Sequence, residues 1–272
     1  MKNIYKALLA TVLSIDVNLV AAQINIYSPN ATNGPTDALI KKIIIPKIEL
    51  IVGSVAYENK PGAEQAYSER HADMGDVLIL TDSNYMRISG ALLDKFEKTY
   101  EPFGIFSVRP AIFFSSGKSA VTLLDFTSKR SIKVGYSGMG STSERCATQI
   151  KNSYGSQITT IAYDSTAKLI QALLSAEIDG VCDSNVGNLE PFVLSHRISP
   201  IAISHQTSIS PYSMLKQFPQ GQANIDVRGF VGFFGRKDDE KTKNHIKTFL
   251  TSIKKDSQAI DDLAKMKYET PK

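Results

Sequence analysis

Short apolar runs rich in β-branched and aromatic residues alternate with segments of helical period along most of the chain. Such runs are typical of buried strands, and the segments between them are typical of helices that cover a sheet. This alternation favours an α/β fold with largely parallel sheets. Strands are predicted at 24–28, 50–57, 76–81, 110–116, 132–136, 158–163, 178–183, 198–204 and 228–235.

The segments between these runs predict the helices. The first is expected over about 36–45 and should end at Pro46, because proline interrupts helical hydrogen bonding. The strand–helix units fall into two clusters and the strand at 228–235 comes late, so two lobes are predicted. The other helices expected before that strand are a polar one up to about residue 70, a short one around 120–127, one of roughly 141–153 and an amphipathic one with Leu169, Ile170, Leu173 and Leu174 on one face.

The first 22 residues have the pattern of an export signal. Lys2 and Lys6 form a basic start, the stretch ALLATVLSI is apolar, and small residues end at Ala22. Asp16 interrupts the apolar stretch, so an ordinary N-terminal strand or helix is the alternative. No other segment approaches the ~20 apolar residues of a membrane span. We expect removal of 1–22, which takes the formal charge from +4 to +3 because two lysines and one aspartate are lost.

The charge and the cysteines limit the possible partners. A small and scattered positive charge argues against nucleic acid. The four histidines do not cluster in the sequence, and neither cysteine has a metal-type spacing, so we expect no metal site and no cofactor. The isolated pair Cys146 and Cys182 favours one disulfide in an exported protein and two buried thiols in a cytosolic one.

The segment VGYSGMGSTSERC (134–146) leads from a predicted strand into a predicted helix. Gly138 and Gly140 permit a tight turn. Ser141 and Glu144 have the spacing of a capping box, in which each side chain accepts from the other residue's amide. The other first-turn amides would stay free for a ligand, and the helix dipole favours an anion there. A capped helix start without a ligand is the alternative.

A dinucleotide site is one enzyme interpretation of this loop. Gly138, Met139 and Gly140 follow a strand and open a helix, as in the phosphate-binding fingerprint of nicotinamide enzymes. Ser143 stands where the third glycine of that fingerprint belongs, however. Export would also be unusual for such an enzyme, so the dinucleotide interpretation is not favoured.

A serine hydrolase is the second enzyme interpretation, with Ser137 as the nucleophile. Asp183 and either His196 or His205 follow it in the chain order of a catalytic triad. A nucleophile elbow needs glycine two residues after the serine, and Met139 occupies that place. A side chain there would clash in the sharp turn. The hydrolase is therefore the alternative, not the main hypothesis.

Several motifs occur together, in order, in one protein family. They are YENKPGA (57–63), the glycine-serine loop, IAYDSTAKLIQALLSAEIDGVCDSN (161–185), and the later strands ISPIAIS and FVGFFG. GPTD (34–37) matches the end of that family's first loop. The chain resembles the tripartite tricarboxylate transporter substrate-binding receptors, the TctC or Bug family of periplasmic solute-binding proteins. The resemblance runs from about Ile24 to the C-terminal helices.

This resemblance implies a two-lobed, type II Venus-flytrap fold in which each lobe is a mixed, mostly parallel sheet flanked by helices. Lobe one would comprise 23–112 and 228–272, and lobe two 113–227. The implied function is capture of a small organic carboxylate between the lobes and delivery to integral-membrane permease subunits, without enzymatic activity. The protein would be periplasmic and monomeric. The alternative partner is a membrane sensor, because a sensor-associated binding protein would have the same fold.

Receptors of this family typically grip the carboxylate with backbone amides, hydroxyls and water, not with an arginine. Two helix N-termini that face each other across a cleft suit an anion. Ser83 follows the predicted strand 76–81 and is expected to line the same cleft. Some relatives have cysteines at the places of Cys146 and Cys182, which supports the disulfide. The positions that the resemblance assigns to the ligand are Asn30, Thr32, Gly34, Thr36, Ser137, Gly138, Ser141, Thr142, Asp183 and Phe230.

Overall fold

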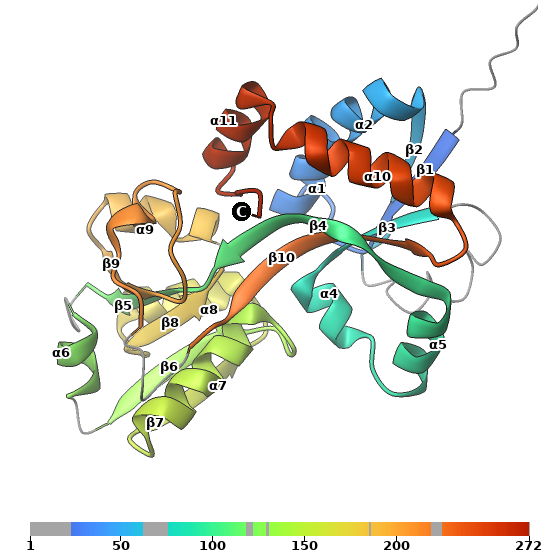
Figure 1. Cartoon of the computed structure of the whole chain (residues 1–272). Helices are drawn as coiled ribbons and strands as arrows, with labels where there is room; N and C mark the ends of the chain where they lie inside the picture. Colours follow the sequence, from blue (N-terminus) through green and yellow to red (C-terminus); the bar gives the residue numbers. More distant parts are fainter. Residues whose placement is uncertain are drawn as a thin grey trace, which may run out of the picture.

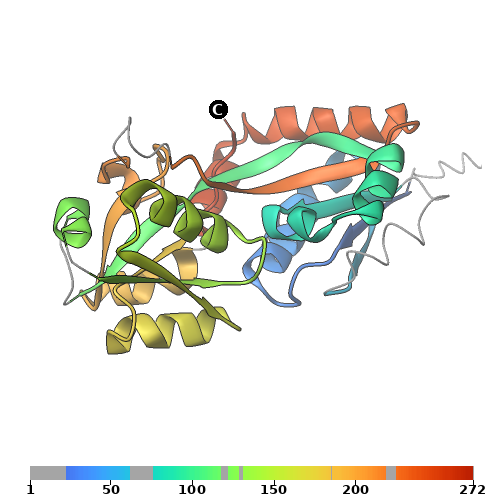
Figure 2. The same cartoon turned by 90° about the horizontal axis from the view of Figure 1, so that it is seen from below.

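The computed structural model describes residues 23–61, 76–117, 122–128, 131–184, 186–218 and 225–271. Among these residues, the strands form two five-stranded sheets, in the orders β2-β1-β3-β10-β4 and β7-β6-β8-β5-β9. Figure 2 shows two lobes side by side, each built around one sheet. The predicted signal segment 1–22 and most of the predicted polar helix that ends near residue 70 lie outside the described residues.

The first sheet has one strand that opposes the others. β1 pairs in parallel with β2 and β3, whereas β10 is antiparallel to both β3 and β4. Alternate residues of β3 serve two cores, because successive side chains of a strand point to opposite faces. Val77 and Ile79 join the core on one face, and Leu78 and Leu80 join the core on the other. The strands are β1 (Gln23–Ser28), β2 (Ser54–Asn59), β3 (Asp76–Thr81), β4 (Tyr100–Pro110) and β10 (Arg228–Arg236).

Helices cover both faces of this sheet (Figure 1). Ile40, Ile48, Ile246 and Phe249 are among the helical side chains packed into the core on one face. On the other face, Phe96 packs into the second core. The helices of the first face are α1 (Pro35–Leu39), the π-helical η1 (Ile40–Ile44), α2 (Ile45–Val52), α10 (Glu240–Ile253) and α11 (Ser257–Lys265), and those of the second are α4 (Asp82–Arg87) and α5 (Ala91–Thr99).

The prediction that the first helix ends at Pro46 is wrong. Helical backbone continues through α1, η1 and α2 to Val52. The wide turn of η1, in which the Ile45 N–H donates to the Ile40 carbonyl, places Pro46 in the first turn of α2. A proline there costs no helical hydrogen bond. The helix ends at Gly53, whose φ is 90°, so the strand predicted from residue 50 begins later.

The second sheet repeats the plan of the first. β6 pairs in parallel with β7 and β8, and β5 is antiparallel to β8 and β9. Cys146 and Cys182 form a disulfide that joins a helix to β8 inside the core, with Cα atoms 5.9 Å apart. The elements are β5 (Ile112–Ser116), α6 (Leu123–Thr127), β6 (Ile132–Ser137), α7 (Thr142–Tyr154), β7 (Ile158–Tyr163), α8 (Thr166–Ser175), β8 (Gly180–Asp183), η2 (Val186–Asn188), α9 (Glu190–Leu194), β9 (Ile198–Ile203) and η3 (Tyr212–Met214).

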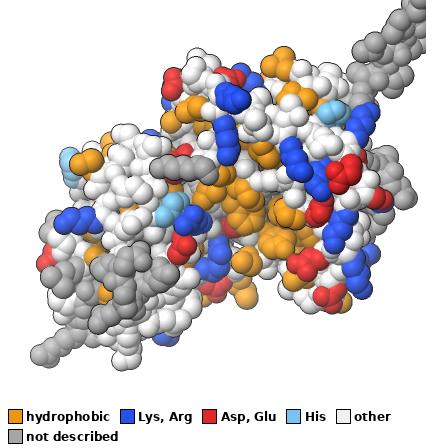
Figure 3. Space-filling view, in the orientation of Figure 1, with side chains coloured by type: hydrophobic (Ala, Val, Ile, Leu, Met, Phe, Trp, Pro, Cys, Tyr) orange, Lys and Arg blue, Asp and Glu red, His pale blue; other side chains and the backbone are white. Residues whose placement is uncertain are grey.

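The chain crosses between the lobes along β4 and β10. The Ala111 N–H, directly after β4, donates to the Val227 carbonyl, directly before β10, at 3.3 Å. The two crossings therefore lie side by side, as Figure 1 shows. Figure 3 shows apolar side chains gathered in the middle of this face, over the region of these two strands.

The segment after α11 adds a third link between the lobes. Lys267 forms an ion pair of 2.7 Å with Glu190 of α9. Glu269 accepts a hydrogen bond of 2.8 Å from the hydroxyl of Thr207. None of the helices in the described ranges has the length and apolar character that a membrane crossing requires.

Candidate functional site

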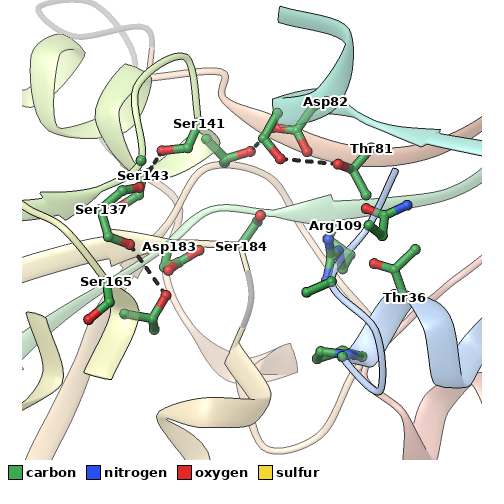
Figure 4. A pocket seen from close by; sticks show the side chains of 18 of the residues that line it. Thr36, Thr81, Asp82, Arg109, Ser137, Ser141, Ser143, Ser165, Asp183 and Ser184 are labelled. Carbon is green, nitrogen blue, oxygen red and sulfur yellow. Dashed lines mark hydrogen bonds between the residues drawn. The ribbon is translucent and has the colours of Figure 1, made fainter. Parts of the chain in front are cut away.

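A polar cavity of about 320 Å³ lies between the two sheets. Loops at the carboxyl ends of β1, β3, β6, β7 and β8 supply most of its wall, and β4 supplies Arg109. Ligands of open α/β sheets bind at this end of the strands. Figure 4 shows the lining side chains, which are mostly hydroxyls. The residues that line the cavity are Asn30, Ala31, Gly34, Pro35, Thr36, Thr81, Asp82, Ser83, Arg87, Arg109, Ser137, Gly138, Ser141, Thr142, Ser143, Asp164, Ser165, Thr166, Asp183 and Ser184.

The glycine-serine loop delivers the N-terminus of α7 to this cavity. Gly138 and Gly140 have φ values of 78° and 70°, which favour glycine, so the chain turns sharply after β6. The Ser141 hydroxyl caps α7 by accepting from the Glu144 N–H at 3.1 Å, and it donates to the Ser137 carbonyl at 2.8 Å. The loop is thereby fixed before any ligand arrives.

The predicted capping box is only half formed. The Glu144 carboxylate accepts from the Gly140 N–H at 2.6 Å, one residue earlier than the pattern requires. The Ser141 N–H instead donates to the Gly138 carbonyl. The Thr142 and Ser143 N–H groups donate to no atom of the described residues, and both residues line the cavity. Two first-turn amides are therefore available to an anion, with the helix dipole behind them.

The first loop is held by its own polar contacts. The side-chain amide of Asn30 donates to the Ser28 hydroxyl at 2.8 Å, and α1 begins at Pro35. The Thr36 hydroxyl lies 3.4 Å from the phenol oxygen of Tyr268, a residue of the segment after α11. This wall of the cavity is thus supported by the C-terminal segment.

Asp37 lies directly behind the first loop and holds its shape. The buried carboxylate accepts from the Asn33 N–H, Lys41, the Tyr57 hydroxyl and the Asn59 amide at 2.7–2.9 Å. Burial acts to raise the pKa of Asp37, but these four donors outweigh it and lower the pKa from 3.8 to about 2. The carboxylate is therefore an anchor with no spare capacity for a ligand.

Asp82 links the two lobes across the cavity. It is 3% exposed and begins α4, directly after β3. Its carboxylate accepts from the Thr142 hydroxyl and forms an ion pair of 3.1 Å with Arg145, both of α7. The Phe230 N–H also lies near it, at 3.4 Å. Charge-assisted contacts of this kind between lobes stabilise the arrangement in which the cavity is enclosed.

Arg109 and Arg87 are the two arginines among the described residues that line this cavity. Arg109 is 7% exposed and its guanidinium stacks 4.6 Å from the ring of Tyr268. Its Nε has no hydrogen-bond partner among the described residues. In the view of Figure 4 its side chain is drawn between Ser184 and Thr36.

No family model matches the sequence, and no curated protein matches it. Solved structures do match. A TctC solute-binding protein from Polaromonas is 17% identical with a TM-score of 0.72, over 92% of this chain and 90% of that one. MatC from Rhodopseudomonas palustris with bound malate is 17% identical with a TM-score of 0.69, over 92% and 90%. An R. palustris protein with adipate is 16% identical with a TM-score of 0.71, over 91% and 88%.

The fold is that of a two-lobed solute-binding protein. At such identities the matches establish the fold, and they confirm the predicted fold class of two mixed sheets flanked by helices. In each sheet four of the five strands of the described chain run in one direction, as the resemblance implies. The name TctC is also that of the family that the sequence resembles.

The solute-binding fold brings nine of the eleven predicted ligand positions to the cavity wall, all within the described residues. Thr32 is exposed and is not among the lining residues. Phe230 lies beside the cavity, where its ring is 6.5 Å from that of Tyr85 and its backbone amide faces Asp82. The lining positions are Asn30, Gly34, Thr36, Ser83, Ser137, Gly138, Ser141, Thr142 and Asp183.

Several lining residues were not predicted from the sequence. Arg109 belongs to β4, which was not predicted as a strand. Ser165 and Thr166 follow the carboxyl end of β7. Because ligands of open α/β sheets bind at the carboxyl ends of strands, the predicted strand 158–163 was the signal that could have found them. Asp82 lies one residue before Ser83, in the loop already singled out. Ser143 departs from the glycine fingerprint of dinucleotide sites, and no other sequence pattern predicts its place in the cavity wall.

The hydrolase interpretation is not supported. The Ser137 hydroxyl lies 3.4 Å from the Thr166 hydroxyl, and no histidine is among the described residues that line the cavity. His196 is exposed, and a ring nitrogen of His205 lies 3.3 Å from the Ser204 hydroxyl. Ser137 has no general base beside it in the described structure, and a serine nucleophile needs one.

Proposed function

We propose that this protein is a periplasmic solute-binding receptor that captures a small organic carboxylate in the interlobe cavity. It then hands the acid to integral-membrane permease subunits, with no bond made or broken in the acid. The single observation that carries the proposal is the N-terminus of α7. There the unpartnered Thr142 and Ser143 amides meet a cavity walled by hydroxyls of both lobes.

The chemistry of this wall suits an anion that must also be released. Backbone amides at a helix N-terminus attract negative charge without a titrating group. Each charge-assisted hydrogen bond contributes roughly 1.5–3 kcal/mol. Three or four such bonds, less the cost of desolvation and closure, are consistent with micromolar binding, about −8 kcal/mol. The malate and adipate of the two matched R. palustris structures are small carboxylic acids of the class proposed here.

Capture and delivery follow from the two-lobed arrangement. A ligand that contacts both walls favours the closed form, because only that form offers all the contacts. A membrane partner that contacts both lobes can thereby distinguish loaded from empty receptor. The Asp82–Arg145 contact would add to the stability of the closed form with or without ligand.

A thermal-shift screen of the chain from residue 23 against a panel of mono-, di- and tricarboxylic acids, sugars and amines tests this proposal. A ligand that binds only the folded chain raises its melting temperature by mass action. We expect one or more carboxylates to raise it and calorimetry to give one site per chain. A response confined to sugars or amines, or no response, would contradict the proposal.

Fluorophosphonate labelling tests the statement that no chemistry occurs. We expect Ser137 to stay unlabelled while the folded chain binds its acid. Stoichiometric modification of Ser137, abolished in a Ser137→Ala variant, would identify a hydrolase and refute the receptor.

A further inference from the structure

Arg109 is a buried cation for which the described part of the chain supplies no anion. The residue is 7% exposed, lines the cavity and belongs to β4 of the first lobe. None of the ion pairs of the described residues involves it, and its buried Nε has no hydrogen-bond partner among them. Because an arginine remains charged at any physiological pH, burial without a partner is unfavourable.

The carboxylates of the same cavity are committed elsewhere. Asp82 is held by Thr142 and Arg145. Asp164 pairs with Lys168 at 2.6 Å. Asp183 also has an interaction of its own. The charge on Arg109 is therefore left for a group that enters the cavity.

Tyr268 fixes the orientation of Arg109. The guanidinium lies 4.6 Å from the centre of the fully buried Tyr268 ring, a distance at which a cation is attracted to the face of an aromatic ring. The Tyr268 hydroxyl lies 3.4 Å from that of Thr36, which itself lines the cavity. Stacking holds the planar guanidinium in place while leaving its N–H groups for a carboxylate.

A second anion-binding feature comes from the other lobe. The Ser143 hydroxyl, in the first turn of α7, is buried and has no hydrogen-bond partner in the described structure, and the residue is 2% exposed. It accompanies the two unpartnered amides of the same turn. Arg109 and the α7 N-terminus thus offer two places for negative charge, one on each lobe.

We propose that Arg109 pairs directly with an anionic group of the ligand, and that the ligand carries two such groups, the second at the α7 N-terminus. This inference rests on the proposed function and narrows it to doubly anionic acids. It departs from the arginine-free grip that the sequence resemblance implies. A singly charged acid satisfies one lobe only, so the second charge is what ties the lobes together.

Matched ligand pairs test the inference in the unaltered protein. Straight-chain dicarboxylates of four to six carbons and their monoamides differ in one charge and little in shape. Calorimetric titration should show that the best dicarboxylate binds roughly 10- to 100-fold more tightly than its monoamide. Equal affinities would overturn the inference and leave the proposed function intact. Binding of no acid of either kind would contradict the proposed function itself.

Variants then test whether Arg109 causes the preference for the dicarboxylate over its monoamide. Arg109→Met should reduce dicarboxylate affinity to about that of the monoamide while changing monoamide affinity less than ~3-fold, and Arg109→Lys should be intermediate because it keeps the charge but loses the planar fork. Arg197→Met is the matched control, since Arg197 stacks on Phe192 at 5.4 Å outside the cavity. Equal loss of both ligands in Arg109→Met and Arg109→Lys would contradict the two-anion arrangement.

Discussion

Single polar side chains hold the cavity walls in place before a ligand arrives. Ser141 caps α7 and ties it back to the Ser137 carbonyl. Asp37 ties the first loop to β2 through Tyr57 and Asn59. The one hydroxyl hydrogen of Ser141 and the carboxylate of Asp37 are thus already engaged, so the donors that meet an anion are their neighbours. Preorganisation of this kind reduces the entropic cost of ordering the site when the ligand binds.

Asp37→Asn should lower the free energy of unfolding by ~2 kcal/mol at pH 7, because it removes the charge that Lys41 and three neutral donors stabilise. The pKa of this carboxyl is lowered from 3.8 to about 2 on folding, so its contribution is complete above pH 4 and is lost as the pH falls through 3.8 towards 2. Urea unfolding of both proteins between pH 7 and pH 2 measures the difference.

The exposed carboxylate Asp238, paired with Arg236, provides the control for this series. Asp238→Asn should change the free energy of unfolding far less than Asp37→Asn does across the same range, as expected for a surface pair. A difference between wild type and Asp37→Asn that does not shrink below pH 4 would show that the charge is not the cause.

Ser141→Ala should destabilise the unliganded chain, whereas Ser143→Ala should not. Ser141→Ala loses a helix cap and should cost about 1 kcal/mol of stability. Ser143→Ala removes a buried hydroxyl that has no partner in the described structure, so it should leave stability unchanged or raise it by about 1 kcal/mol. Ligand affinity should fall in Ser143→Ala. Unfolding curves with calorimetry check both, and a large destabilisation by Ser143→Ala would refute its assignment to the ligand.

At the scale of elements, strand identity was more predictable than helix ends. The β-branched run of 76–81 coincides with β3 because both faces of that strand are buried. β4 was not predicted, since Pro102 and Gly104 interrupt its pattern. It tolerates them because it lies at the sheet edge and its pairing with β10 shifts register twice. The missed strand carries Arg109, so the cavity's buried cation was missed with it.

The disulfide between α7 and β8 should stabilise the element that presents the ligand-facing amides. It closes a loop with a sequence separation of 36 residues. Replacing both Cys146 and Cys182 by alanine should lower the free energy of unfolding by about 2–4 kcal/mol, because the unfolded chain regains freedom. Reduction of the wild type should reproduce the loss, and reduction of the double variant should do nothing. Equal stability of the two proteins would contradict a structural role.

At the scale of the molecule, the two lobes are joined by two crossing strands and by the segment that holds Tyr268 and Lys267. The sequence predicted the two-lobed plan from its repeated units, but contacts between lobes such as Asp82 with Arg145 depend on the closed geometry and leave no local pattern. Asp82 was therefore not predicted as more than a loop residue.

Asp82→Ala should open the unliganded molecule, because it removes the ion pair with Arg145 and the hydrogen bond from Thr142. Small-angle X-ray scattering should give a larger radius of gyration than that of the wild type, and a saturating acid should reduce the difference. Asp226→Ala, which loses the exposed pair with Arg228, is the control of equal charge. An unchanged radius would show that the contact does not hold the lobes together.

The most direct measurement is an amide NMR titration of the isotope-labelled chain with the acid that binds best. We expect large, saturable shifts of the Thr142 and Ser143 amides together with residues of the first loop, Asn30 and Thr36, at one molar equivalent. Shifts confined to a single lobe, or distributed over the outer surface while α7 stays unperturbed, would contradict binding between the lobes.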